Sequence, residues 1–404
     1  MSKDTFNEKA FESAIEYHLT EKGGYRTREH ADFNRALCLD TEVFLEFVQS
    51  TQAREWEYLA NIHKGDVSKV IIDDLVRALG SEHEGTLSVL RHGFKCYGRT
   101  IQSAFFAPAS GMNPETLRLY NENILTITRQ ARFSTAHEQS IDTVLTINGI
   151  PVVTIELKNP FTGQTWRNAI HQYKADRNPD DLIFSFKRRA LVHFAVDPDE
   201  IYMTTRLAGD KTYFLPFNRG CENGKGNPNN PDGYKTAYLW EEVLSRDSLM
   251  DIMGRFIHLQ IEEKKYDGKT IKRETMIFPR YHQLRCVRRL IASTKEEGAG
   301  HKYLVQHSAG SGKSNSIAWL AYHLSSLHDA EDNRIFSSVI VITDRRVLDQ
   351  QLQNTIYQFE HKKGVVQKID TDSTQLAESL NTAVPIIITT LQKFPFVIEK
   401  VGDI

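Results

Sequence analysis

The sequence predicts an α/β protein of two domains, residues 1–260 and residues 261–404. In both parts, short apolar runs that favour strands alternate with longer segments whose apolar residues recur at helical spacing. The segment 219–233, RGCENGKGNPNNPDG, holds too much Gly, Asn and Pro for a regular element. We expect a long surface loop there, followed by a helical stretch over residues 238–260 that leads out of the first domain.

The composition indicates a soluble globular protein. Of the 404 residues, 40% are hydrophobic, which is enough to build sizeable cores. Lysine and arginine number 50 against 52 aspartates and glutamates, so a nucleic-acid contact would depend on local basic patches. No apolar run approaches the roughly 20 residues of a membrane span, and the first residues, MSKDTFNEKAFE, are charged. We therefore expect no membrane contact, a cytoplasmic location and reduced cysteines.

The first domain is predicted to begin with helices and to continue with strands. Residues 6–19 form an amphipathic helix with Phe11, Ile15 and Leu19 at helical spacing, and Glu12 and Glu16 are expected on its solvated face. The other expected elements are helices within residues 40–80, strands at 124–133, 140–147, 150–158, 191–196 and 201–205, and a helix over 165–175.

The strand pair 140–158, SIDTVLTINGIPVVTIELK, carries the first candidate site. Side chains alternate between the faces of a strand, so Glu156 and Lys158 share a face. A two-residue turn at Asn148-Gly149 would leave Asp142 on the opposite face from Glu156. We therefore predict a three-residue loop or a β-bulge that brings Asp142, Glu156 and Lys158 together.

Two converging carboxylates repel each other unless a cation lies between them, and Mg²⁺ prefers oxygen ligands of this kind. The predicted ligands are Asp142, Glu156 and the carbonyl oxygen of Leu157. Lys158 would position or activate a water molecule, or stabilise a charged phosphate. The alternative is an ordinary hairpin with solvated charges, because a Glu-x-Lys pattern is common in strands.

The order of helix, strand, Asp strand, Glu-x-Lys strand and helix resembles the PD-(D/E)xK nuclease core. Ile141 stands where that group often has proline before the aspartate, a departure that the group tolerates. Some nucleases of the Type I restriction group carry a Q-x-x-x-Y motif in the following helix. The resemblance makes Gln172 a further catalytic candidate, whereas Asp176 occupies the tyrosine position.

The second candidate site lies in residues 302–314, KYLVQHSAGSGKS. We predict a short buried strand, a glycine loop and a helix over residues 313–327, the context of a phosphate-binding loop for ATP. Lys313 would reach the β and γ phosphates and Ser314 would hold Mg²⁺, with Gly310, Ser311 and Gly312 forming the loop. His307 replaces the first glycine of the usual pattern.

Segments around this loop resemble superfamily 2 helicases. Gln283, in FPRYHQ, matches the glutamine that reads adenine in such motors. Residues 339–351 and 385–394 resemble segments that touch the tracked strand, with helix capping or core-edge polarity as the alternative. The DNA-binding candidates are Arg345, Arg346, Thr389 and Thr390, together with Lys187, Arg188 and Arg189 in the first domain, where a solvated loop is equally expected.

A nuclease core followed by such a motor resembles the restriction subunit of Type I restriction-modification enzymes. The resemblance implies Mg²⁺-dependent cleavage of double-stranded DNA, ATP-driven translocation, and assembly with methyltransferase and specificity subunits. The chain stops before any DEAD/DEAH-type acidic box, so we expect this RecA-like lobe to be incomplete and without ATPase activity alone. Two alternatives remain, a helicase or remodeller whose first domain binds without cleaving, and a docking module with vestigial sites.

Overall fold

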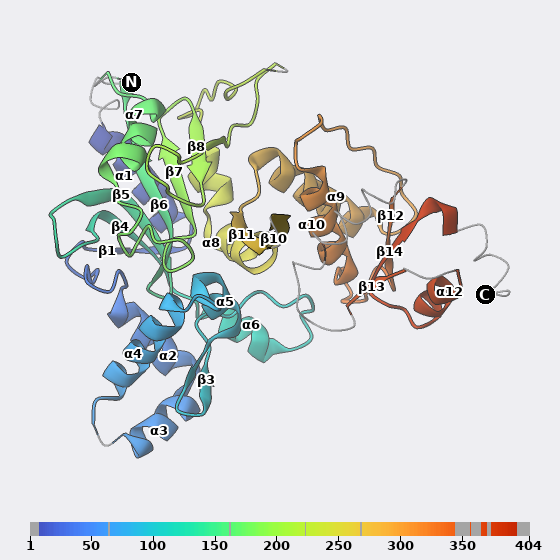
Figure 1. Cartoon of the computed structure of the whole chain (residues 1–404), viewed down its shortest axis with the longest axis horizontal. Coiled ribbons are helices and arrows are strands. Elements are labelled where there is room, and N and C mark those ends of the chain that lie inside the picture. Colours follow the sequence, from blue (N-terminus) through green and yellow to red (C-terminus); the bar gives the residue numbers. More distant parts are fainter. Residues whose placement is uncertain are drawn as a thin grey trace. The chain divides into compact units, whose positions relative to one another are not determined.

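The computed structural model describes residues 8–63, 65–160, 163–222, 224–266, 269–343, 356, 365–369 and 373–393. The chain forms two compact units (Figure 1). The first contains Met1–Ala107 and Pro114–Gly254, and the second contains Pro108–Asn113 and Arg255–Ile404. Both units are mixed α/β. Among the described helices, none has the length and apolar character that crossing a membrane requires.

Helices dominate the beginning of the first unit. Helix α1 (Glu8–Glu21) buries Phe11, Ile15 and Leu19, as the spacing predicted. The helical reading of residues 40–80 is also confirmed, with side-chain caps from Asp40 and Asp66 beginning two of the helices. The elements of this region are α2 (Thr41–Thr51), α3 (Ala53–Ile62), α4 (Val67–Gly80), α5 (Gly85–His92), β2 (Phe94–Cys96), β3 (Arg99–Ile101) and α6 (Pro114–Asn121).

A seven-stranded sheet in the order β1-β4-β5-β6-β7-β8-β9 organises the first unit. The β1–β4 and β6–β7 pairs are parallel and the others are antiparallel. Every residue of β6 is buried, so the hairpin has no solvated outer face. The strands are β1 (Tyr25–Arg28), β4 (Leu125–Arg132), β5 (Ser140–Ile147), β6 (Ile150–Leu157), β7 (Val192–Val196), β8 (Ile201–Thr204) and β9 (Leu215–Pro216).

A two-residue turn and a β-bulge together set the register of the β5–β6 hairpin. Asn148 and Gly149 have φ of 49° and 77°, the left-handed values that such a turn requires. A Cβ on Gly149 would lie 2.0 Å from the carbonyl oxygen of Asp40, so only glycine fits. The pairing shifts next to Thr146, and Thr143 then lies opposite Ile155. The predicted bulge is thus confirmed, and Val152 is its extra residue.

The helix expected over residues 165–175 changes type along its length. It begins as α7 (Trp166–His171), capped by Thr165, and continues as the π-helical turn η3 (Gln172–Asp176). Helix α7 packs on β6, β7 and β8. The stretch predicted as helical over 238–260 is helical only to Phe256, through η4 (Leu239–Val243), α8 (Arg246–Asp251) and η5 (Ile252–Phe256). Its last residues instead pair in a hairpin.

The second unit begins with that hairpin, β10 (His258–Tyr266) with β11 (Lys269–Ile277). Its three-stranded sheet is parallel, with β14 between β12 and β13. Side chains of β14 alternate, so Ile386 and Ile388 join the core with Ala318 and Ala321 of α10, and Ile387 joins the core with α12. The elements are α9 (Tyr281–Glu297), α10 (Lys313–Ser325), β12 (Val339–Thr343), β13 (Val366–Lys368), α12 (Ser373–Asn381), β14 (Ile386–Thr390) and η6 (Leu391–Lys393).

One predicted element of the second unit is wrong. Residues 302–308 were expected to form a buried strand before the glycine loop, but they carry no regular structure. Leu304 is 94% exposed, because none of the described strands pairs with this segment. The apolar pattern therefore identified a strand-like sequence without the neighbour that would bury it.

Candidate functional sites

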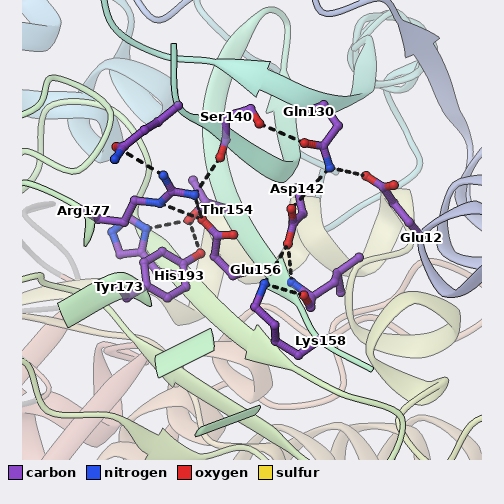
Figure 2. A network of polar contacts seen from close by, with 12 residues as sticks. Glu12, Gln130, Ser140, Asp142, Thr154, Glu156, Lys158, Tyr173, Arg177 and His193 are labelled. Carbon is purple, nitrogen blue, oxygen red and sulfur yellow. Dashed lines mark hydrogen bonds and ion pairs between the residues drawn. The ribbon is translucent and has the colours of Figure 1, made fainter. Parts of the chain in front are cut away.

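The bulged hairpin brings the predicted acidic pair and lysine into one cluster (Figure 2). Asp142 comes from β5, and Glu156 comes from β6, with Lys158 directly after that strand. Glu156 is fully buried, and Asp142 and Lys158 are each less than 10% exposed. The Lys158 Nζ lies 3.8 Å from Asp142 Oδ2, so the amine faces the aspartate as expected.

Asp142 is held from two sides. Its Oδ2 accepts a hydrogen bond from the backbone N–H of Leu157 at 2.7 Å, which ties it to the neighbouring strand. Its Oδ1 accepts from the side-chain amide of Gln130 at 3.3 Å. The Leu157 carbonyl oxygen, the predicted third metal ligand, accepts from Lys158 Nζ at 2.9 Å. Asp142 and the Leu157 carbonyl oxygen, two of the three predicted oxygen donors, are therefore linked through Lys158.

Arg177 holds the other carboxylate. Its Nε and Nη2 both donate to Glu156 Oε1, at 2.9 and 2.7 Å. Glu156 Oε2 is buried and has no hydrogen-bond partner among the described residues. Burial, and next the charge of Asp142, raise the pKa of Glu156 to about 8, while Arg177 and Lys158 act to lower it.

A chain of polar contacts links Asp142 to helix α1. Gln130 Nε2 also donates to Glu12 Oε1 at 3.1 Å, and Gln130 Oε1 accepts from Ser140 Oγ at 2.9 Å. Gln130 has φ of 49°, a left-handed conformation that is costly for a residue in a strand. Glu12 is 6% exposed and pairs with Arg129 at 2.6 Å. Its expected solvated position is therefore wrong.

Beneath Glu156, Thr154 shares its hydroxyl between two buried side chains. The Thr154 Oγ1 lies 2.8 Å from both Tyr173 OH and His193 Nδ1. Burial lowers the pKa of His193 to about 3, which keeps the imidazole neutral at physiological pH. This packing fixes the start of the π-helical turn against β6 and β7.

The residues present fit a divalent metal ion in part. Two carboxylates and a carbonyl oxygen are a donor set suited to a hard cation, and the orphaned Glu156 Oε2 is an unsatisfied ligand. The described residues contain no group of three or more His, Cys, Asp or Glu side chains arranged to hold a metal. Backbone oxygen and water would have to complete any such shell.

The remaining candidates of the first unit lie in different surroundings. Gln172 is half-buried at the first position of η3. Arg188 is exposed, and Lys187 is half-buried with its Nζ donating to the Glu82 carbonyl oxygen. Arg189 is 1% exposed and donates to the backbone carbonyls of Leu37 and Arg188. Its expected position in a solvated, phosphate-accessible loop is therefore wrong.

In the second unit, the glycine loop stands directly before α10. Gly310 and Gly312 have φ of 73° and 80°, which favour glycine. Lys313 Nζ donates to the loop's own carbonyl oxygens, at 2.9 Å to Ser308 and 3.3 Å to His307. Its ammonium group thus lies inside the loop, where a phosphate-binding lysine is needed.

Gln283, predicted to read adenine, is hydrogen-bonded to this loop. It is 3% exposed, its Nε2 donates to the Gly312 carbonyl oxygen at 2.9 Å, and its Oε1 accepts from the Arg280 N–H. Among the DNA-binding candidates, Thr389 and Thr390 are buried in β14, which agrees with their alternative reading as core-edge residues. Arg345 and Arg346 lie outside the described residues.

Two segments of the chain match families of known proteins. Residues 49–212, which include Asp142, Glu156 and Lys158, match the family described as Type I restriction enzyme R protein N terminus. Over these residues the chain is similar to an R protein N-terminal region. Residues 282–402, which include the glycine loop, match the SWI2/SNF2 ATPase family.

Curated relatives of the chain are named as endonuclease subunits of Type I restriction enzymes. The chain is 25% identical to the HindI endonuclease subunit of Haemophilus influenzae over 61% of this chain and 23% of that protein. It is 24% identical to the putative MjaVIIIP endonuclease subunit of Methanocaldococcus jannaschii over 58% of this chain and 21% of that protein. The chain thus matches little more than a fifth of the length of these Type I restriction enzyme subunits.

Sequence reasoning missed Arg177 and Gln130. Arg177 directly follows the Gln-x-x-x-Asp segment at the end of the π-helical turn, and its side chain reaches Glu156. Gln130 lies opposite Asp142 in an irregular part of β4, between the pairs Arg129↔Thr143 and Ala131↔Ile141. The strand sequence LTITRQAR contains several polar residues, so its pattern did not single out Gln130.

Proposed function

We propose that the chain is the nuclease part and the first motor lobe of a Type I restriction endonuclease subunit, which acts on double-stranded DNA. The observation that carries this proposal is that Asp142 and Glu156 stand next to the pair Thr143↔Ile155 of a bulged hairpin, with Glu156 Oε2 left unsatisfied. In this proposal the first unit has a PD-(D/E)xK fold and the second is a RecA-like lobe. The match of residues 49–212 to the R protein family supports it.

Asp142, Glu156 and the Leu157 carbonyl oxygen would hold Mg²⁺. When bound, the ion would orient a water molecule and stabilise charge on the phosphodiester. Lys158, whose Nζ lies between Asp142 Oδ2 and the Leu157 carbonyl oxygen, would hold that water or a phosphate oxygen. Gln172 stays a candidate for contact with substrate, and Arg188 for contact with the DNA backbone.

The second unit would bind ATP through residues 310–314 and couple ATP turnover to translocation of duplex DNA. Lys313 would exchange its contacts with Ser308 and His307 for phosphate oxygens. We further propose assembly with modification and specificity subunits, which would select the DNA sequence. The match of residues 282–402 to the SWI2/SNF2 ATPase family supports the first of these proposals, and the Type I restriction enzyme subunit names of the relatives support the second.

One observation favours a second function. The Arg177–Glu156 pair already places a cation on the glutamate, as in a structural ion pair of a DNA-binding domain that does not cleave. That domain would serve a helicase or remodeller. The two functions differ in whether Glu156 is needed for hydrolysis.

The test uses the chain within its assembled enzyme. Glu156→Gln keeps the shape of the side chain but removes the charge, and we expect at least a roughly hundredfold slower cleavage with ATP hydrolysis retained. Glu138→Gln, at an exposed position, is the control and should cleave normally. Unchanged cleavage by the Glu156→Gln enzyme would reject the nuclease and favour the second function.

A further inference from the structure

Arg177 makes an unusual contact with Glu156. An arginine commonly binds a carboxylate with two parallel hydrogen bonds, one to each oxygen. Here Nε and Nη2 converge on the single atom Oε1, at 2.9 and 2.7 Å (Figure 2). The second oxygen, Oε2, has no hydrogen-bond partner within the described part of the chain. The arginine therefore occupies one oxygen of the carboxylate and leaves the other available.

The rest of the guanidinium is anchored independently of Glu156. Nη2 also donates to the backbone carbonyl oxygen of Ser140 at 2.6 Å, and Nη1 donates to Gln139 Oε1 at 3.4 Å. The central carbon of the guanidinium lies 5.4 Å from the centre of the Phe133 ring, and Arg177 is 4% exposed. Ser140 is on β5, the strand that also carries Asp142. Arg177 thus connects the backbone of the aspartate strand to the side chain of the glutamate.

We propose that Arg177 is a positioning residue that makes Glu156 a one-oxygen metal ligand, with Oε1 fixed by the guanidinium and Oε2 presented beside Asp142. This inference rests on the proposed function. A carboxylate held at one oxygen and at a fixed rotamer loses little freedom on binding a cation. A purely structural ion pair would stabilise the fold without affecting the affinity for a metal.

The experiment measures Mn²⁺ binding by titration calorimetry on the whole chain, without DNA or ATP. Arg177→Lys keeps the positive charge but has a single side-chain nitrogen. That nitrogen cannot replace the two hydrogen bonds to Glu156 Oε1 and the hydrogen bond to the Ser140 carbonyl oxygen. We expect about tenfold weaker Mn²⁺ binding for Arg177→Lys, and a larger loss for Arg177→Met. Arg167→Lys, an exposed arginine on α7, is the matched control and should bind as the wild type does.

The outcomes separate this inference from the proposed function. If Glu156→Gln binds Mn²⁺ as tightly as the wild type, the metal site itself is absent and the proposed function fails. If Glu156→Gln loses binding but Arg177→Lys binds within twofold of the wild type, or more tightly, only the positioning role is overturned. If Arg177→Met does not fold, the Arg177→Lys result decides, and its folding is checked by circular dichroism.

Discussion

At the scale of single residues, the candidate site depends on buried charges. Alternation along β6 predicted that Glu156 and Lys158 share a face, and the structure confirms that they cluster with Asp142. The prediction for Glu12 was wrong because helical spacing cannot show that Arg129 and Gln130 bind its carboxylate. Which polar residue becomes buried is decided by partners that lie far away in the sequence.

The buried glutamate predicts a pH dependence of stability. The pKa of Glu156 is raised to about 8, so the folded protein binds this proton more tightly than the unfolded chain does. Without metal, its contribution to stability is therefore present at low pH and is lost as the pH rises from about 4.5 to about 8. We expect Glu156→Gln to remove this loss, a difference of roughly 1 kcal/mol per pH unit in that window.

The measurement is urea unfolding in EDTA at pH 5, 6.5 and 8. Glu138→Gln, which removes an exposed carboxylate, should follow the wild type at every pH. If the free energies of unfolding of the wild type and Glu156→Gln changed equally with pH, Glu156 would be ionised in the folded protein over the whole pH range.

At the scale of elements, local pattern predicted strands and α-helices well but not their irregular parts. The bulge was predictable because the chemistry of Asp142 and Glu156 excluded a regular register. The π-helical turn Gln172–Asp176 was not, because its sequence has ordinary helical spacing. The segment 302–308 failed for a third reason, since a strand requires a neighbour that the described residues do not supply.

Because of the bulge, we expect that removing one residue from β6 and adding one residue to it have different effects on the site. Deleting Val152 removes the extra residue, so a regular hairpin would still place Asp142 opposite Glu156. A bulge accommodates one extra residue, so inserting alanine after Val152 would shift the pairing by one residue and turn Glu156 to the other face. We expect the deletion to retain Mn²⁺ binding and the insertion to abolish it. Val152→Ala, with unchanged residue number, is the control, and equal binding by both length variants would contradict this account.

At the scale of the whole molecule, the two candidate sites belong to different compact units. This arrangement predicts that they can be inactivated separately. Lys313→Ala removes the ammonium that lies inside the glycine loop, so we expect loss of ATP binding with Mn²⁺ binding at Asp142 and Glu156 unchanged. In the assembled enzyme, translocation and cleavage should stop together.

The control for this prediction is Lys302→Ala, an exposed lysine outside the glycine loop. Binding of a fluorescent ATP analogue and Mn²⁺ titration measure the two sites on the same preparation. Cleavage by the Lys313→Ala enzyme at the wild-type rate would show that hydrolysis of DNA does not require the motor.

The π-helical turn Gln172–Asp176 has a consequence for length variation among related enzymes. Each residue of a helix rotates the following chain by about 100°, so losing one residue from this turn would direct a side chain other than Arg177 toward Glu156. Neither strand of the hairpin would need to change. Natural or engineered length changes here would alter how Glu156 is held while the acidic pair itself stays constant.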